Sequence, residues 1–292
     1  MKYITLNDLS KTIRTNIWKI PRDIDFIMSI PRSGTIAASI ISEFLNVPLI
    51  DIDSFIAGVK PYGGGRLRHF FRRHTVETKK VLVVDDTVFS GKSKIEAREK
   101  LKGFPEYNFI FMAVYLEGPN KEAVDFYLED VSRYTNGFTE LVYYEWNIFH
   151  HNEGDMLGFL FDLDGVFSPD PPDERNEEEY INYIKNAPPL FIPTTKIGGI
   201  ITYRLVKNKE ITEKWLADNG VDYGFLAMVN AQTWEERNAM GVPPEQMKGE
   251  AYRSLPQYRL FVESNPHQAQ RIAEISGKPV LCVENNILYN GQ

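Results

Sequence analysis

Two clusters of acidic residues at the ends of apolar runs are the features of this sequence best suited to chemistry. The first follows the run KVLVV, where Asp85 and Asp86 precede the turn Ser-Gly-Lys-Ser at residues 90–93. These carboxylates can accept hydrogen bonds from a ribose diol, directly or through a bound Mg²⁺. The N–H groups of the turn, at the start of a predicted helix, favour a phosphate monoester. The pattern predicts a site for ribose 5-phosphate, and the alternative is an acidic strand end with an N-capping serine.

The second cluster lies in FLFDLDGVF, residues 159–167, where Asp162 and Asp164 end an apolar run. Residues two apart in an extended chain point to the same side, so both carboxylates can reach one substrate. One can attack a phosphorus atom while the other protonates the leaving oxygen, with Mg²⁺ neutralising the charge between them. The DxDG spelling also begins a calcium loop, but the sequence lacks the later ligands of an EF-hand.

The composition limits the classes of function. The chain has 292 residues and a net charge of -7, which argues against nucleic acid as a main partner because phosphate backbones require a basic surface. The single cysteine, Cys282, cannot form an internal disulfide and fits a reducing compartment. The sequence has no signal-peptide core and no apolar run long enough to span a bilayer. We therefore expect a cytoplasmic protein without an integral membrane segment.

Short apolar runs alternate with helical patterns along almost the whole chain. Five runs in the first half are typical of strands: residues 25–30, 47–52, 80–86, 108–116 and 140–146. A second series begins at residue 156 and continues through IGGIITYRL, YGFLAMV, YRLFVES and PVLCVEN. Such alternation predicts βαβ units and mainly parallel sheets covered on both faces. We predict two doubly wound α/β domains, residues 1–152 and residues 153–292.

The first domain resembles the type I phosphoribosyltransferases, which use phosphoribosyl pyrophosphate (PRPP) with Mg²⁺. The resemblance covers roughly the first 150 residues. It rests on the segment 79–93, on Pro31-Arg32-Ser33-Gly34, which is similar to the family's pyrophosphate loop, and on GVKPYGGGRLRHFFRRHTVE. The last segment suits a lid over pyrophosphate or, alternatively, a solvated basic surface. Besides Arg66 and Arg68, the lid segment contains Arg72 and Arg73. The resemblance implies a PRPP site, with Asp85 and Asp86 also catalytic, made of Arg32, Ser33, Gly34, Arg66, Arg68, Asp85, Asp86, Thr87, Val88, Phe89, Ser90, Gly91, Lys92 and Ser93.

Two features bear on the acceptor of the transfer. Several base-using members of the family carry a carboxylate just before the phosphate turn, whereas this sequence has Phe89 there. The aromatic run YYEWNIFHH resembles the hood that stacks on the acceptor ring. Its residues Tyr144, Trp146 and Phe149 would equally stack on a sugar or form the seam between the domains.

Residues 156–292 resemble the haloacid dehalogenase-like phosphatases. After the two aspartates come Thr202 at a predicted strand end, Lys248, and Glu263 at the end of YRLFVES, in the order of that family. The resemblance implies that Asp162 is the nucleophile and Asp164 the general acid/base. It also implies that Thr202 and Lys248 hold the phosphoryl group, and that Mg²⁺ is bound by Asp162, Asp164 and Glu263.

The same segment departs from the family in two ways. The last motif usually contains aspartates, and here His267 stands where a second acid is expected. Only about forty residues separate Asp164 from Thr202, which leaves room for a minimal cap and predicts an open site. A degenerate, merely structural domain is the alternative.

Together the two sites predict a bifunctional enzyme. The first domain would transfer 5-phosphoribosyl from PRPP to an acceptor, and the second would hydrolyse the 5-phosphate to leave ribofuranose. The chain is similar to the phosphoribosyltransferase–phosphatase pairs of bacterial polysaccharide biosynthesis, which implies a hydroxyl of a saccharide, free or lipid-linked, as the acceptor. The main alternative is a nucleobase phosphoribosyltransferase fused to a nucleotidase. A third is a regulator that binds PRPP without transfer.

Overall fold

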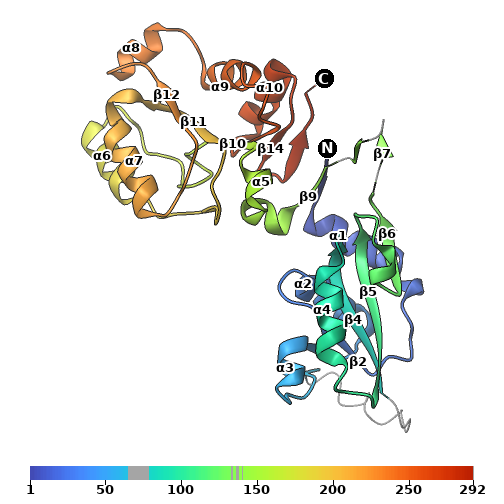
Figure 1. Ribbon diagram of the computed structural model, residues 1–292. Coiled ribbons are helices and arrows are strands. Elements are labelled where there is room, and N and C mark those ends of the chain that lie inside the picture. The colour runs from blue at the N-terminus through green and yellow to red at the C-terminus, as the bar shows by residue number, and fades with distance from the viewer. Residues whose placement is uncertain (65–78, 133, 136–137, 140, 292) are drawn as a thin grey trace. The chain divides into compact units, whose positions relative to one another are not determined.

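The computed structural model describes residues 1–64, 79–132, 134–135, 138–139 and 141–291. It divides into two compact units, Met1–Trp146 and Asn147–Gln292, each with its own sheet (Figure 1). None of the helices in the described ranges is long and apolar enough to cross a membrane.

A five-stranded parallel sheet forms the centre of the first unit. Its strands lie in the order β3 (Leu49–Asp51), β2 (Phe26–Ser29), β4 (Lys79–Val88), β5 (Tyr107–Leu116) and β6 (Phe126–Asp130). Its helices are α1 (Leu6–Thr15), η1 (Ile17–Lys19), α2 (Gly34–Leu45), α3 (Ile52–Ile56), α4 (Lys92–Leu101) and η4 (Lys121–Ala123). Two small sheets join β1 (Lys2–Ile4) to β9 (Val142–Tyr144), and β7 (Tyr134–Thr135) to β8 (Phe138–Thr139).

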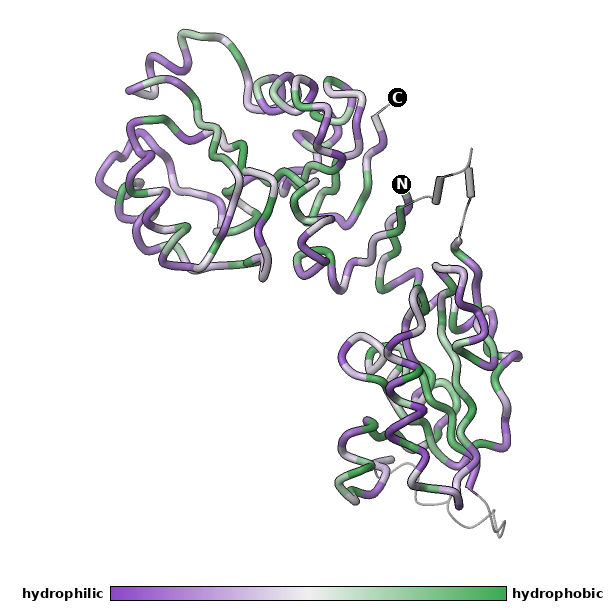
Figure 2. The backbone as a smooth tube through the Cα atoms, in the orientation of Figure 1, coloured by the Kyte–Doolittle hydropathy of each residue, from purple (hydrophilic) through white to green (hydrophobic). Residues whose placement is uncertain are grey.

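The unbroken apolar run of β4 explains why helices cover both faces of this sheet. Leu82 and Val84 share a hydrophobic cluster with Ala37 of α2, whereas Val83 shares another with Ala97 of α4. Successive side chains of a strand point to opposite faces, so a continuous apolar run buries both of them. Figure 2 shows the hydrophobic residues concentrated along these central strands.

The second unit contains a six-stranded sheet. Its strands lie in the order β12 (Leu226–Val229), β11 (Gly199–Leu205), β10 (Phe159–Phe161), β13 (Leu260–Glu263), β14 (Val280–Cys282) and β15 (Ile287–Tyr289). All neighbours are parallel except the edge pair β14 and β15. The helices are α5 (Glu153–Met156), α6 (Glu177–Asn186), η6 (Val206–Asn208), α7 (Lys209–Asp218), α8 (Trp234–Ala239), α9 (Pro244–Arg253) and α10 (Pro266–Ser276). The helix η5 (Glu145–His150) contains the division between the units.

Each sheet has one place where the direction of strand addition reverses. In the first unit the chain goes from β2 to β3 on one side and then from β4 through β6 on the other. In the second unit it goes from β10 through β12 and then from β13 through β15. Ligands of open parallel sheets bind at the carboxyl ends of the strands at such a point. We therefore expect ligands to bind at the carboxyl ends of β2 and β4 in the first unit, and of β10 and β13 in the second.

The prediction of mainly parallel α/β structure is confirmed in both units. The strands β6 and β15 were not predicted. Both lie at sheet edges, and β6 contains two acidic residues, so neither carries the apolar run of a strand that is covered on both faces. Antiparallel β15 follows β14 directly, as a short edge hairpin rather than a βαβ unit.

Candidate active sites

The first candidate site lies at the carboxyl ends of β2 and β4. Asp85 and Asp86 belong to β4, and both are buried, with exposed fractions of 7% and 3%. Buried carboxylates require hydrogen-bond partners. Two donors serve Asp86, because the Ser33 hydroxyl donates to Oδ1 at 2.9 Å and the Trp146 indole Nε1 donates to Oδ2 at 2.8 Å.

Asp85 has a charged partner. The ammonium group of Lys94 in α4 donates to its Oδ2 atom at 2.5 Å, and the Ser93 hydroxyl donates to the same atom at 3.2 Å. Its Oδ1 atom accepts the backbone N–H of Asp86 at 3.0 Å. Burial raises the pKa of Asp85 to about 7, although the Lys94 ammonium opposes that rise.

The predicted pyrophosphate loop lies directly against this acidic pair. Ser33 and Gly34 begin α2 immediately after the loop, and the Ser33 N-cap position makes no side-chain capping bond. A Cβ atom on Gly34 would stand 2.8 Å from Asp85 Oδ1 and 2.9 Å from the Val84 carbonyl oxygen. Only glycine allows α2 to approach β4 this closely. The side chain of Arg32 is exposed at the edge of the site.

The predicted phosphate turn leads into α4. Gly91 is its N-cap residue with φ of 75°, in the left-handed region that glycine adopts readily, and it has no side chain to cap the helix. The Ser90 hydroxyl accepts the Lys92 N–H at 3.4 Å. The helix N-terminus therefore keeps backbone N–H groups for an anion. Lys92 and Phe89 are exposed beside it, whereas Val88 is buried. The predicted lid residues Arg66, Arg68, Arg72 and Arg73 lie outside the described residues.

The predicted aromatic hood is divided between the units. The Tyr144 and Trp146 rings of the first unit lie 5.0 Å apart. The Tyr144 hydroxyl donates to the Glu117 carboxylate at 3.1 Å. In the second unit, Phe149 stacks on Phe191 at 4.9 Å. Tyr144 and Trp146 thus lie at the first site, and Phe149 belongs to the packing of the second unit.

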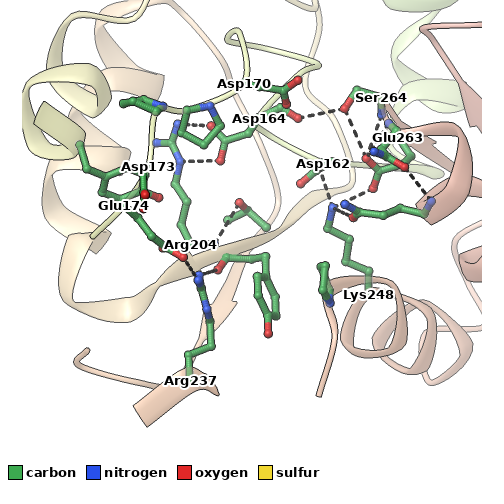
Figure 3. Close-up of a pocket in the computed structure, with 18 of the residues that line it drawn as sticks. Asp162, Asp164, Asp170, Asp173, Glu174, Arg204, Arg237, Lys248, Glu263 and Ser264 are labelled. Atoms are coloured by element: carbon green, nitrogen blue, oxygen red, sulfur yellow. Dashed lines mark hydrogen bonds and ion pairs between the residues drawn. The ribbon is translucent and has the colours of Figure 1, made fainter. Parts of the chain in front are cut away.

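The second candidate site is a pocket of about 430 Å³ at the carboxyl ends of β10, β11 and β13 (Figure 3). Asp162 follows β10, Glu263 ends β13, and Lys248 comes from α9. The Lys248 ammonium donates to Asp162 Oδ2 and to Glu263 Oε2, each at 2.7 Å. A third bond, to Gln268 Oε1 at 2.9 Å, completes its three donors.

The charges in this pocket are mutually dependent. Burial and the neighbouring Glu263 raise the pKa of Asp162 well above its usual range, and Lys248 opposes that rise. Burial alone would lower the pKa of Lys248, but Asp162 and Glu263 more than offset this and raise it overall. Two carboxylates share one ammonium group here, so with both ionised the cluster would have one negative charge in excess, and the raised pKa of Asp162 favours uptake of a proton.

Asp164 is separated from that cluster and held by an arginine that the sequence analysis did not select. Arg204 is 2% exposed, and its Nε and Nη2 atoms donate to the two Asp164 oxygens at 3.0 and 2.6 Å. The Tyr183 hydroxyl donates to Oδ1 at 2.9 Å. Figure 3 shows Asp164 directed to Arg204, while Asp162 and Glu263 are directed to Lys248. The three predicted metal ligands therefore do not form one cluster.

The described residues contain no group of three or more His, Cys, Asp or Glu side chains that could hold a metal ion. Within the pocket, Asp162 and Glu263 are the candidate ligands of a divalent cation, because both contact Lys248 and line the pocket. Glu263 would have to exchange for the cation the Ser264 and Asn265 N–H groups that its Oε1 atom now accepts. Thr202 lies within β11 rather than at its end, is 1% exposed, and lines the same pocket. His267, at the start of α10, does not line it.

The acidic loop after Asp164 forms part of the rim. Asp170, Asp173 and Glu174 line the pocket, and Glu174 forms an ion pair with the nearly buried Arg237 of α8. Arg237 also donates to the Tyr203 carbonyl oxygen at 2.9 Å. The loop and α8 are thereby held together at the pocket mouth. In the sequence, only the opposite charges of Glu174 and Arg237, in two distant segments, indicate this pairing.

Comparison with known proteins identifies the first unit. The Phosphoribosyl transferase domain family model matches residues 3–145. Similar solved structures include a Helicobacter pylori xanthine-guanine-hypoxanthine phosphoribosyltransferase, at 15% identity and a TM-score of 0.35, covering 50% of this chain and 92% of that one. A *Pyrococcus horikoshii* purine phosphoribosyltransferase has 20% identity and a TM-score of 0.34, covering 49% and 92%.

A chain of the Pnkp1/Rnl/Hen1 complex is also similar, at 14% identity and a TM-score of 0.33, covering 96% of this chain and 94% of that one. No curated protein matches the sequence. The family match covers both strands that carry the first site and the loops after them. Residues 3–145 therefore form a phosphoribosyltransferase domain.

Proposed function

We propose that the chain is a bifunctional enzyme that transfers 5-phosphoribosyl from PRPP to an acceptor and then hydrolyses the 5-phosphate. Residues 1–152 would carry out the transfer and residues 153–292 the hydrolysis. The observation that supports this most strongly is that each unit has a buried, lysine-paired aspartate at the switch point of its sheet. A buried titratable group with a perturbed pKa and a specific charge partner is a candidate for a functional residue.

The transfer half rests on the geometry around β4. The Asp85 and Asp86 carboxylates would accept hydrogen bonds from the ribose hydroxyls, in place of the protein donors that now serve Asp86. The uncapped N-terminus of α4 would receive the 5-phosphate. The Ser33–Gly34 start of α2, also without a side-chain cap, would receive pyrophosphate. Arg32, exposed at the same edge, supplies positive charge for it.

The hydrolysis half rests on the pocket of the second unit, which we assign to the haloacid dehalogenase-like phosphatases. Lys248 holds Asp162 at Oδ2, which leaves Oδ1 as the atom offered to phosphorus. Asp164 now accepts hydrogen bonds from Arg204 at both oxygens, so it would have to leave that contact and take up a proton before it could protonate the leaving oxygen. It would then take a proton from the attacking water. Asp162 and Glu263 would hold Mg²⁺, which would supply positive charge for the phosphoryl oxygens. Thr202 would donate a hydrogen bond to one of them.

The order of the two reactions follows from where the phosphate is held. A 5-phosphate bound at the start of α4 is not available to another site until the transfer product leaves. We therefore expect the phosphatase to act on the transfer product and much less on PRPP. Equal specificity constants for PRPP, ribose 5-phosphate and the transfer product would instead indicate a general sugar phosphatase.

The leading candidate acceptor is a hydroxyl of a saccharide. The position just before the phosphate turn is Phe89, which is 57% exposed and carries no charge to take a proton from a ring nitrogen. The phosphatase pocket also has an open side, which suits a phosphate carried on a larger molecule. The pocket walls include Tyr180, Tyr203 and Trp234, aromatic faces on which a sugar can stack.

A nucleobase is the second candidate, because the structure supplies a carboxylate from another strand. Glu117 directly follows β5, and its backbone N–H donates to the Val88 carbonyl oxygen at 3.0 Å, beside the PRPP motif. Its carboxylate accepts the Tyr144 hydroxyl, next to the Trp146 ring that bonds Asp86. A flat acceptor could stack there and give its proton to Glu117.

One incubation separates these acceptors. The protein is mixed with PRPP, Mg²⁺ and either a set of nucleobases or a set of saccharides, and the products are weighed by mass spectrometry. We expect saccharides that have gained a ribosyl group, with pyrophosphate and phosphate released. Gain of mass by nucleobases alone would favour the second candidate. No pyrophosphate release with either set would contradict the proposed transfer.

A further inference from the structure

Lys94 is a buried cation at the first site that the phosphate turn does not require. It lies one residue beyond the Ser-Gly-Lys-Ser turn, as the third residue of α4, and its side chain is 3% exposed. Its ammonium group bonds the Asp85 carboxylate at 2.5 Å and also the Thr87 carbonyl oxygen. A lysine is rarely buried this fully unless it is paired. The charge of Lys94 is therefore fixed at the acidic pair.

Asp85 has little capacity left for a metal ion. Its Oδ1 atom accepts the Asp86 N–H, and its Oδ2 atom accepts both the Lys94 ammonium and the Ser93 hydroxyl. A Mg²⁺ ion binds carboxylate oxygen at about 2.1 Å. At Oδ2 such an ion would stand against the ammonium group, and because Asp85 and Lys94 are both buried, solvent would screen the two positive charges poorly. The donor set around Asp85 does not fit a metal ion.

Asp86 differs in the kind of donor that it has. Ser33 and Trp146 are neutral donors, and ribose hydroxyls are neutral donors as well, so one can replace the other without changing the charge of the site. Lys94 cannot be displaced in this way, because moving either charge leaves the other buried without a partner. Asp85 therefore keeps its charged partner when a sugar binds, whereas Asp86 can exchange its neutral donors for the sugar hydroxyls.

We propose that Lys94 takes the place of a metal ion as the countercharge of the ribose-binding carboxylates, so that the first site binds a ribose 5-phosphate group without a divalent cation at Asp85. Lys94 is a positioning residue, since it fixes Asp85 and does not touch the reacting atoms. The inference rests on the proposed transfer function. It applies to the ribose 5-phosphate part of PRPP and not to a cation bound to the pyrophosphate.

Ribose 5-phosphate is the probe that isolates this contact, because it lacks pyrophosphate. Binding is measured by calorimetry in the full-length Asp162→Asn protein, which does not hydrolyse the probe, once with Mg²⁺ and once with EDTA. The same titration is repeated after Asp85→Asn and Asp86→Asn are added. The heat of binding that remains is assigned to the second unit and is subtracted. We expect the same dissociation constant in both conditions.

The same titration on Lys94→Met should show binding weaker by about tenfold or more in EDTA, with part of the loss restored by Mg²⁺. Lys100→Met is the matched control, because it removes an exposed lysine from the same helix. It should bind like the parent protein. Thermal unfolding shows whether each variant is folded. If Lys94→Met is not folded, the dissociation constants of the parent protein with Mg²⁺ and with EDTA test the inference.

Three outcomes would overturn the inference. Ribose 5-phosphate binding that needs Mg²⁺ in the parent protein would show a metal ion in the role assigned to Lys94, and would leave the transfer function standing. Unchanged binding by folded Lys94→Met in EDTA would show that Lys94 has no such role. Absence of first-site binding in both conditions would contradict the proposed function itself.

Discussion

Each of the two sites pairs a buried lysine with acidic side chains, but the number of carboxylates around the lysine differs. At the first site Lys94 meets one carboxylate, that of Asp85, and a backbone carbonyl oxygen. At the second site Lys248 meets two carboxylates, those of Asp162 and Glu263, and an amide oxygen. With the carboxylates ionised, the first pair is neutral, whereas the second cluster has one negative charge in excess.

This difference indicates where a cation is needed. A neutral pair can hold a sugar through hydrogen bonds alone, while two carboxylates around one ammonium group favour a divalent cation before a phosphate dianion enters. We therefore expect Mg²⁺ to matter more for the hydrolysis than for binding of the ribose group. The predictions below test this contrast, beginning with the largest expected effect.

Removing the acidic pair of the first site should separate the two activities completely. Asp85→Asn with Asp86→Asn should lower pyrophosphate release by about 10³-fold or more, because the ribose hydroxyls lose both charged acceptors. Phosphate release from ribose 5-phosphate should be unchanged. Parallel assays of pyrophosphate and phosphate check this, and normal pyrophosphate release would show that the first site is misplaced.

Breaking the buried pair of the first site should destabilise its unit. Asp85→Asn leaves the Lys94 ammonium without its partner, and we expect a loss of about 3 kcal/mol in the free energy of unfolding. Adding Lys94→Met should recover part of that loss. Hydrogen exchange of β4 in a double-mutant cycle measures the coupling energy.

The exposed pair Lys100–Asp53 is the control for that cycle. Its coupling energy should be about 0.5 kcal/mol, since solvent screens both charges. Equal coupling energies for the two pairs would mean that burial does not strengthen the Lys94 contact.

Arg204 should matter for the proton that Asp164 delivers. Arg204→Lys loses the two-pronged contact with Asp164, and kcat for an alkyl phosphate should fall by about 10- to 100-fold with little change in KM. Hydrolysis of an aryl phosphate should fall less, because its leaving group needs no proton. Tyr183→Phe, which removes a neutral donor from Asp164, should have a smaller effect. Equal losses on both substrates would point to a structural role.

The first site should also respond to pH through Asp85. Its pKa of about 7 in the folded protein means that the carboxylate form, which accepts the sugar hydroxyls, is lost as the pH falls below that value. Ribose 5-phosphate binding should weaken on the acid side. Because Lys94 lowers the pKa, Lys94→Met should move this acid limb to higher pH by about one unit. If the acid limb lies at the same pH in Lys94→Met as in the native protein, the titration of Asp85 does not cause it.

The sequence predicted the first site better than the second because the first is local. Asp85, the phosphate turn and the start of α4 are continuous in the chain, so strand, turn and helix signals place them together. Lys94 was missed although it is only 9 residues from Asp85, because a lysine near a helix start is typical of an exposed position.

The second site depends on contacts between distant segments. Lys248 reaches Asp162 across 86 residues, and Arg204 reaches Asp164 across 40. A family resemblance suggested Lys248, but no local pattern marks Arg204, which lies in a strand among apolar residues. Its burial is explained only by the folded structure, in which Asp164 supplies an acidic partner and Tyr183 of α6 an aromatic one.

The central claim is that the two sites act in succession on one phosphoribosyl group, and a time course on Asp162→Asn tests it most directly. The native protein, with PRPP and its acceptor, should form a phosphoribosyl product that appears first and then gives way to the ribosyl product. In Asp162→Asn the phosphoribosyl product should accumulate, because the proposed nucleophile is removed. Lys248→Ala should accumulate it as well, which excludes a contaminating phosphatase. Mass spectra showing only the ribosyl product from both variants would contradict the account.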